Sequence, residues 1–242
     1  INRLKSNQPW GVFAVVGKKS SGTTIYNLVA KGGSKDFQHN INFSGMVSFH
    51  HTNNLKVKNL ELSHNSLGDD TLRIISSNVL AENLNIFSCA FDCIDFDFVN
   101  GKVNNAIIED AGNDCFDFMS SNINLNDISS NKCGDKGFSI GELSNIYGTN
   151  VKIENAEIAI AVKDKSLGIL KNIKVSDSNF GFRNYKKNWR YGGSGKIIFH
   201  NAVFKNITKE DSFSTKKNFT SPSNIKQDNN SFGKYPIYLW SK

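Results

Sequence analysis

The sequence predicts an all-β fold, a single-stranded right-handed parallel β-helix (solenoid) with about 22 residues per coil. The first observation is an internal repeat, because six segments of one pattern start 22 residues apart, at Asp70, Asp92, Asp114, Lys136, Ile158 and Phe180. The second is that apolar columns of the repeat alternate with variable columns, which is the period of two of a β-strand. The third is length, since so short a repeat cannot bury its own apolar face and must stack on its neighbours.

Two apolar columns define the inward face of one predicted strand in each coil. The first column holds Leu72, Ile94, Phe116, Phe138, Ile160 and Phe182, and the second holds Ile74, Phe96, Phe118, Ile140 and Val162. Each repeat carries a further apolar pair, such as Leu84 with Ile86, so one coil has at least two strands. With parallel strands about 4.8 Å apart, the outward columns form ladders too, and these are free to carry chemistry.

The segments on either side of the repeat are less regular. Shorter alternating patterns in 11–16, 25–29, 41–43, 46–49 and 55–62 predict terminal coils that drift from the consensus. We expect one solenoid domain over 1–204 and a basic Asn/Lys/Ser-rich C-terminal cap or tail over 205–242. Gly, Asn and β-branched residues recur in every coil, which argues against a helical solenoid.

Bulk properties restrict the class of protein and partner. No apolar stretch approaches the roughly 20 residues that a membrane-spanning helix needs, so we predict no transmembrane segment. Because the first residue is Ile1 rather than methionine, we expect a fragment or processed form of a longer product. The net charge is +7, but lysines concentrate in 185–191 and in the tail while the middle coils are acidic. Such a charge is typical of partners such as nucleic acid, an anionic polysaccharide or an acidic membrane surface, and this distribution argues against nucleic acid as the first choice. A solvated basic tail is the alternative interpretation.

The four cysteines fall in two columns of the repeat. Cys93 and Cys115 lie one coil apart, so their Cα atoms should be about 5 Å apart, within reach of a disulfide. Cys89 and Cys133 share a column two coils apart, about 10 Å, which is too far. Small residues occupy the same columns in other coils, so we expect four buried or half-buried thiols, and no zinc site because no Cys-x-x-Cys spacing occurs.

Three carboxylates are expected to crowd one outward face. The column after the first apolar position holds Arg73, Asp95 and Asp117, and Asp97 lies two residues beyond Asp95. Carboxylates this close repel one another unless a cation, a base or a raised pKa relieves them. We therefore predict a metal site for Ca²⁺ formed by Asp95, Asp97 and Asp117, because Ca²⁺ prefers sets of carboxylate oxygens. The aspartates that begin each strand, Asp70, Asp92 and Asp114, are expected to stabilise turns.

Two catalytic mechanisms could use this face. A bound calcium ion could hold a uronate group and favour proton abstraction beside it, with Lys136, Lys163 or Arg73 as the base of a lyase or epimerase. A glycoside hydrolase would instead divide its acid and its base or nucleophile between Asp95 and Asp117. The five histidines lie mainly outside the regular repeat, so a Ser-His-Asp triad has no support.

Further polar and aromatic residues continue the same face toward the C-terminal coils and are predicted to bind substrate. Glu142 and Asp164 share one column of the repeat, and an aromatic such as Trp189 can stack on a sugar ring. The predicted substrate-binding residues are Glu142, Asp164, Arg183, Tyr185 and Trp189.

The segments 92–98, 113–121, 134–142 and 160–164 carry a resemblance to a known family. They resemble repeats of pectate-lyase-like right-handed parallel β-helix proteins, especially bacterial cell-surface β-helix proteins that can accompany a spore-coat-type kinase domain. The resemblance covers about residues 40–195 and implies the β-helix fold and a secreted, extracellular or cell-surface location. The Asn-Thr-Asp, Gly-His-Gly and Arg-Ile-Lys motifs of polygalacturonases are absent, so the resemblance leaves the activity open.

The sequence thus leaves three functions open. The favoured one is a carbohydrate-active or carbohydrate-binding β-helix that acts on an anionic polysaccharide, with calcium-assisted lyase or epimerase chemistry if it is an enzyme. The alternatives are a non-catalytic cell-surface or assembly scaffold and a glycoside hydrolase that uses an aspartate pair. No feature of the repeat predicts an oligomeric state.

Overall fold

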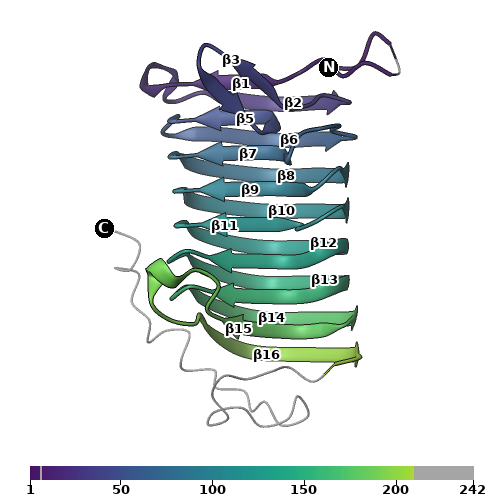
Figure 1. Ribbon diagram of the computed structural model, residues 1–242, viewed down its shortest axis with the longest axis vertical. Helices are drawn as coiled ribbons and strands as arrows, with labels where there is room; N and C mark the ends of the chain where they lie inside the picture. The colour runs from purple at the N-terminus through teal and green to yellow at the C-terminus, as the bar shows by residue number, and fades with distance from the viewer. Residues whose placement is uncertain (6, 210–242) are drawn as a thin grey trace.

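The chain forms a parallel β-solenoid whose strands stack along its long axis (Figure 1). The structure is a computed structural model, and it describes residues 1–5 and 7–209. The predicted parallel β-helix with about 22 residues per coil is confirmed. No helix among the described residues is both long and apolar enough to cross a bilayer. The predicted cap over 205–242 lies outside the described residues from 210 onward.

Two parallel ladders build the solenoid, and short corners join them. Ladder A contains β1 (Phe13–Val16), β5 (Gly45–His50), β7 (Asp70–Ile75), β9 (Asp92–Asp97), β11 (Phe116–Met119), the second halves of β12 (Asn122–Gly141) and β13 (Asn145–Lys163), and β15 (Phe180–Tyr185). Ladder B contains β2 (Thr24–Lys31), β6 (Leu55–Ser63), β8 (Asn78–Cys89), β10 (Asn100–Ala111), the first halves of β12 and β13, β14 (Leu167–Ser178) and β16 (Lys196–Ile207). The remaining elements are the antiparallel hairpin β3 (Asp36–Gln38) with β4 (Ile41–Phe43) and two short 3₁₀ helices, η1 (Lys18–Ser20) and η2 (Trp189–Tyr191).

The pairing register of ladder A is the one that the repeat predicts. Phe116 pairs with Ile94 in the preceding coil and with Phe138 in the next, so the apolar columns become inward ladders. Ile94, Phe116 and Phe138 each have an exposed fraction of 0%. The outward column pairs in the same register, with Asp95 between Arg73 and Asp117. We call the outward surface of ladder A face A.

A row of asparagines shapes the bend within ladder B. Asn59, Asn83 and Asn105 all adopt left-handed backbone conformations, with φ of 56°, 56° and 58°. Their side-chain amides donate along the axis, Asn83 to Asn59 at 2.7 Å and Asn105 to Asn83 at 2.9 Å. Asparagine tolerates this conformation better than most residues, so one residue type supplies both the bend and the ladder.

Asn83→Ala is expected to lower the free energy of unfolding by about 2 kcal/mol. The left-handed conformation costs alanine about 1 kcal/mol, and two exposed hydrogen bonds are lost at about 0.5 kcal/mol each. Asn83→Gly removes the same bonds without the backbone penalty, so it should cost about half as much. Urea unfolding of both variants measures the difference, and equal losses would contradict a backbone role for Asn83.

The expectation of four free thiols is wrong, because all four cysteines are in disulfides. Cys89 pairs with Cys93 and Cys115 with Cys133, with Cα–Cα distances of 5.3 and 5.4 Å. The predicted partners for a disulfide, Cys93 and Cys115, are therefore not joined to each other. The physical reason is that cysteines at the end of a ladder B strand face cysteines at the start of a ladder A strand across the corner.

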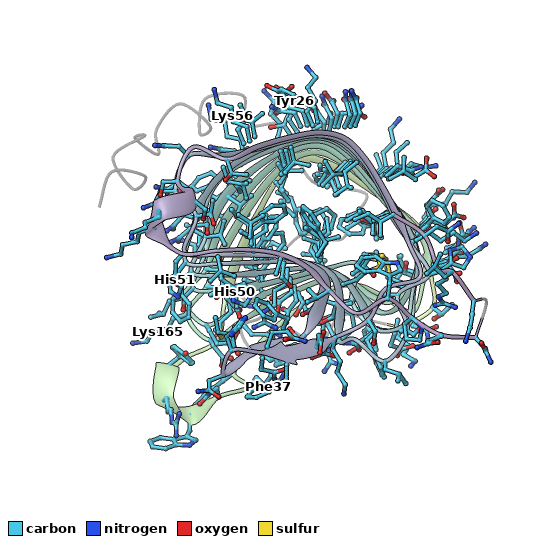
Figure 2. All side chains as sticks on the ribbon, turned by 90° about the horizontal axis from the view of Figure 1, so that it is seen from above. Tyr26, Phe37, His50, His51, Lys56 and Lys165 are labelled. Carbon is cyan, nitrogen blue, oxygen red and sulfur yellow. A yellow bond between two sulfur atoms is a disulfide. The ribbon has the colours of Figure 1, made fainter. Side chains whose placement is uncertain are left out.

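Two longer connections project on the face A side of the solenoid. The hairpin β3–β4 separates β2 from β5 at the N-terminal end, and residues 186–195 separate β15 from β16 at the other end. Figures 1 and 2 show both on the same side of the solenoid. The corners between them that follow β7, β9 and β11 span only 76–77, 98–99 and 120–121. The middle of face A is thus flanked along the axis by these two connections.

Candidate acidic site on face A

Arg73 organises one group of acidic side chains on face A. Its guanidinium forms ion pairs with Asp70 at 3.1 Å, with Asp95 at 2.9 Å and with Asp97. The Ser44 hydroxyl joins the group, donating to Asp70 at 2.6 Å and accepting from Arg73 at 2.7 Å. The structure therefore places Asp95 and Asp97, two of the predicted metal ligands, against an arginine.

The pKa values of the carboxyl groups around Arg73 are raised. Burial raises the pKa of Asp70 to about 6, against the lowering effect of Ser44 and Arg73. Burial also raises the pKa of Asp95 well above its usual range, and the neighbouring Asp70 and Asp97 add to that effect. One guanidinium cannot compensate three buried carboxylates, so the group binds protons more tightly than exposed aspartates do.

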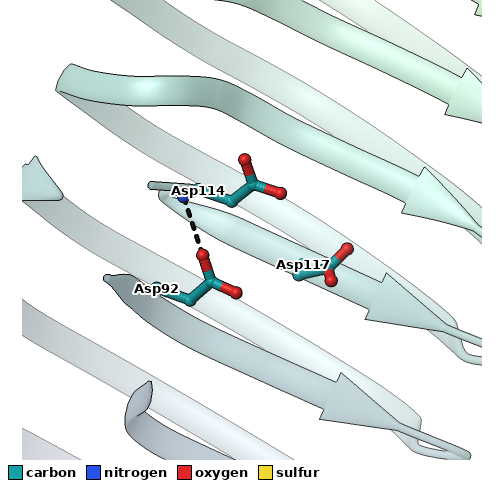
Figure 3. Close-up of side chains that lie close together, drawn as sticks. All are labelled: Asp92, Asp114 and Asp117. Atoms are coloured by element: carbon teal, nitrogen blue, oxygen red, sulfur yellow. Dashed lines mark hydrogen bonds between the residues drawn. The ribbon is translucent and has the colours of Figure 1, made fainter. Parts of the chain in front are cut away.

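A second group consists of Asp92, Asp114 and Asp117, whose side chains converge on face A (Figure 3). One carboxylate oxygen of each residue lies within 4.8 Å of those of the other two. Asp92 is 7% exposed and Asp114 is 4% exposed, whereas Asp117 is half-buried. We call these three residues the Asp117 group. The structure thus groups Asp117, the third predicted metal ligand, with two residues expected only to stabilise turns.

Local backbone structure accounts for the convergence. The Asp92 carboxylate accepts the Asp114 backbone N–H at 2.8 Å and the Asn113 side-chain amide at 2.7 Å. In the next coil, Asp114 accepts the Lys136 backbone N–H at 3.0 Å. Asp92 and Asp114 therefore do stabilise the turns, as expected, and the same hydrogen bonds hold their carboxylates beside Asp117.

Burial and mutual repulsion raise the pKa values of this group. The pKa of Asp92 is raised to about 8, mainly by burial and also by the charge of Asp114. The hydrogen bond from the Asp114 backbone N–H acts in the opposite direction. Burial raises the pKa of Asp114 to about 6, while the nearby Lys136 lowers it. At neutral pH the Asp92 carboxyl therefore keeps its proton when no cation is bound. A cation bound by the three carboxylates would stabilise their ionised forms instead.

The three predicted bases, Lys136, Lys163 and Arg73, differ in whether they form ion pairs with aspartates. Lys136 Nζ pairs with Asp114 at 3.3 Å and with Asp135. Burial lowers the pKa of Lys136, but Asp114 and Asp135 outweigh it and the pKa rises to about 12. Lys163 Nζ is buried and donates to Ser139 Oγ at 2.8 Å. Arg73 forms ion pairs with Asp70, Asp95 and Asp97. Two of the three candidate bases are therefore ion-paired with aspartates, and the described contacts of Lys163 include a hydroxyl instead.

Similarity to known proteins is found in the fold and not in the sequence. No protein family model matches the chain, and no curated protein matches it. Five chains of solved structures are similar to it, among them the following two. One is a pectate lyase from Bacillus sp. N165 in complex with trigalacturonate, at 12% identity and a TM-score of 0.47, covering 90% of this chain and 84% of that one. The other is tailspike protein 2 from Escherichia coli O157:H7 bacteriophage CAB120, at 14% identity and a TM-score of 0.41.

The tailspike match is partial. It covers 75% of this chain and 25% of the tailspike, so the chain spans a quarter of that protein's length. The β-helix that the sequence resemblance implies is present in this chain. Association with a spore-coat-type kinase domain stays a prediction.

Of the predicted substrate-binding residues, Arg183 and Tyr185 lie on β15 at the C-terminal end of ladder A, and the others lie at corners or in the connection after β15. Glu142 is half-buried at a corner, and burial raises its pKa, with Lys163 opposing and Asp117 adding to the increase. Arg183 lies over the rings of Phe180 and Tyr185, at 4.7 and 5.7 Å from their centres. Tyr185 is half-buried and lies near Lys136. Trp189 is 76% exposed in η2.

Asp164 differs from the other predicted substrate-binding residues because it is fully buried. One of its carboxylate oxygens accepts the backbone N–H groups of Lys187 and Asn188 at 2.7 and 2.8 Å. Its position in the structure is therefore that of an anchor for the segment after β15.

Sequence reasoning missed Asp92 and Asp114 as members of a carboxylate group. Strand alternation puts residues three apart on opposite faces, yet Asp114 and Asp117 lie together. Alternation does not apply here, because β11 begins only at Phe116 and Asp114 belongs to the turn before it. The available signal was the column of aspartates at 70, 92 and 114, one coil apart.

Proposed function

We propose that this protein binds an anionic polysaccharide along face A and that the Asp117 group holds a Ca²⁺ ion there. The observation that carries the proposal is the convergence of three carboxylates within 4.8 Å. The hydrogen bonds from Asp114 and Asn113 do not prevent the rise of the Asp92 pKa to about 8, so a divalent cation would stabilise the group.

The donor set fits a hard cation. Calcium–oxygen distances are about 2.3–2.6 Å, so two ligands of one ion lie up to about 5 Å apart, as the oxygens of this group do. Three carboxylates supply at most six oxygens, and Ca²⁺ takes six to eight. Coordination positions therefore stay available to a ligand from outside, and a bound ion would link the protein to carboxylates of the polymer.

Lys163 is the candidate base for lyase or epimerase chemistry on such a polymer. Arg73 and Lys136 are held by ion pairs with aspartates, whereas the described contacts of the Lys163 amine include a neutral hydroxyl, that of Ser139. Lys163 also lies close enough to influence Asp114 and Glu142. Elimination needs an amine that can accept a proton, and an ion pair with a carboxylate opposes that.

The raised pKa of Asp92 supports glycoside hydrolysis as a second candidate function. A carboxyl group with a pKa of about 8 is protonated at neutral pH and can serve as a general acid. Asp117 lies beside it and is the more exposed partner. Asp92 would protonate the leaving oxygen, and Asp117 would act as the base or nucleophile.

The disulfides support a location outside the cytoplasm. Both bonds join cysteines that are at most 6% exposed. Disulfides form and persist mainly in secreted, periplasmic and cell-surface proteins. A polysaccharide partner outside the cell is consistent with that location.

Calcium titration by calorimetry tests the proposed cation site. The wild-type protein is expected to bind Ca²⁺, and Asp117→Asn is expected to bind at least about tenfold more weakly because one ionised ligand is lost. Glu61→Gln is the matched control, since Glu61 is an exposed carboxylate on ladder B. Absence of binding by the wild type, or equal affinity of Asp117→Asn, would contradict the proposal.

Product analysis separates the candidate activities. A uronate polymer incubated with the protein should give an unsaturated, ultraviolet-absorbing product if elimination occurs, and Lys163→Met should abolish it. Reducing ends without that absorbance would instead indicate hydrolysis. A protein that neither binds nor cleaves such polymers, and that self-associates, would be a scaffold.

A further inference from the structure

The segment 186–191 forms a basic loop between β15 and β16, outside the Asp117 group. It contains Lys186, Lys187 and Arg190 together with Trp189, and all four side chains are exposed. Trp189 is 76% exposed, and the Arg190 guanidinium lies 5.7 Å from its ring centre. An exposed indole and three exposed cations thus lie within six residues of one connection.

The structure shows a loop held in place from beneath. Buried Asp164 accepts the N–H groups of Lys187 and Asn188, and the Asn188 side chain accepts the Arg190 N–H at 3.1 Å. The Lys165 N–H reaches the Gly193 carbonyl at 3.3 Å and ties the far end to the corner after β13. A loop fixed by backbone hydrogen bonds loses less conformational entropy when a ligand binds to it.

The cations of the basic loop form no close ion pair with any carboxylate of the described residues. Within residues 1–5 and 7–209, Lys186, Lys187 and Arg190 form no ion pair. The lysines closer to the acidic groups behave differently, as Lys136 shows by its pairs with Asp114 and Asp135. The loop therefore offers exposed positive charge that no close ion pair within the described residues neutralises.

The basic loop adjoins the acidic part of face A. The half-buried Glu142 lies close enough to both Asp117 and Lys187 for their charges to act on its pKa. Tyr185, the last residue before the loop, lies near Lys136, which pairs with Asp114. One ligand chain can therefore contact the loop and the Asp117 group together.

We propose that the basic loop is a second binding subsite, which takes the acidic groups of a polysaccharide directly and needs no cation. Lys186, Lys187 and Arg190 pair with carboxylate or sulfate groups, and Trp189 stacks on a sugar ring. The subsite rests on the proposed polysaccharide function for its ligand class. It does not rest on calcium binding by the Asp117 group.

The surroundings favour a polysaccharide over a nucleic acid in this subsite. Nucleic acid carries a phosphate about every 3.4 Å along a strand, and its binding sites neutralise many of them in succession. Here the surface becomes acidic at Asp135, two coils before β15, and at Asp114 and Asp117, three coils before it. The short cationic run does not continue over these coils, so the surface does not follow a phosphate backbone along its length.

Binding of polygalacturonate in EDTA tests the subsite without the cation. The wild type is expected to bind, with affinity that falls as salt increases. The triple variant Lys186→Ala, Lys187→Ala, Arg190→Ala should bind about 10- to 100-fold more weakly, because three exposed ion pairs are lost. Trp189→Ala should weaken binding without changing the salt dependence.

A second triple variant supplies the matched control. Lys56→Ala, Lys102→Ala, Lys174→Ala removes the same charge from exposed positions on ladder B, and it should stay within about twofold of the wild type. Equal losses in the two triples would overturn the subsite, as would absence of wild-type binding in EDTA. An oligothymidylate bound more tightly than polygalacturonate would overturn the assignment to polysaccharide.

Asp117→Asn separates this proposal from the calcium site. The variant should keep its EDTA-resistant binding while it loses any gain that Ca²⁺ provides. If the wild type shows no calcium effect yet binds in EDTA, the calcium proposal fails and the subsite stands. If binding is absent in EDTA and appears with Ca²⁺, the subsite fails and the calcium proposal stands.

Discussion

Phe118→Ala is expected to lower the free energy of unfolding by about 3–5 kcal/mol. Phe118 is 0% exposed, and its ring centre lies 5.9 Å from that of Phe96, 5.7 Å from Phe116 and 6.2 Å from Phe138. The substitution removes a ring that three consecutive coils share. The surrounding backbone is held by parallel pairing on both sides, so it cannot collapse to fill the space.

Urea unfolding followed by far-ultraviolet circular dichroism measures the effect of Phe118→Ala. Phe37→Ala is the control, because Phe37 is 64% exposed in the hairpin β3–β4 and should change stability by less than about 1 kcal/mol. A Phe118→Ala protein within about 1 kcal/mol of the wild type would show that the aromatic column does not hold the coils together.

Asp92→Asn is expected to change the pH dependence of stability. The pKa of Asp92 is raised from 3.8 to about 8 in the folded protein. The folded state therefore keeps a proton that the unfolded state releases near pH 4. Stability from this group is fully present below pH 4 and decreases as pH rises toward 8. The loss over that range is on the order of 3–5 kcal/mol.

Asparagine at position 92 cannot release a proton in this range, and its side-chain oxygen can still accept the N–H groups of Asn113 and Asp114. The variant should match the wild type at pH 4 and exceed it in stability at pH 8, in EDTA. Thermal unfolding across this range tests the crossover, with exposed Glu61→Gln as a control that should follow the wild type. Parallel curves for Asp92→Asn and the wild type would exclude a proton held by Asp92.

The strict spacing of the repeat made the fold and the register of face A predictable. Because the apolar columns that contain Ile94 and Phe96 recur without a shift, the residues opposite Asp95 and Asp97 in adjacent coils follow from counting along the chain. The apolar positions then assign the inward and outward sides of each strand. Pairing between coils was therefore accessible from the sequence.

Contacts at the corners were not predictable in the same way. The partners of Cys89 and Cys115 depend on how the chain turns between ladders, which column spacing does not describe. The same holds for Asp114, which belongs to a turn and swings toward Asp117. Asp164 is a third example, because its role depends on the path of a loop that has no counterpart in the other coils.

The corners differ in length from coil to coil, whereas the strands keep one register. Folding therefore constrains the spacing of residues within the strands more than the length of the corners. Ladder B pairs Leu80 with Lys102 in the regular coils, whereas Ile169 pairs with Ile198 across the long connection without loss of register. An extra residue within a strand would turn every following side chain to the opposite face, but residues added at a corner leave the ladders intact. New loops can therefore be grafted beside face A, and a solenoid of this kind can acquire a different ligand without rebuilding its core.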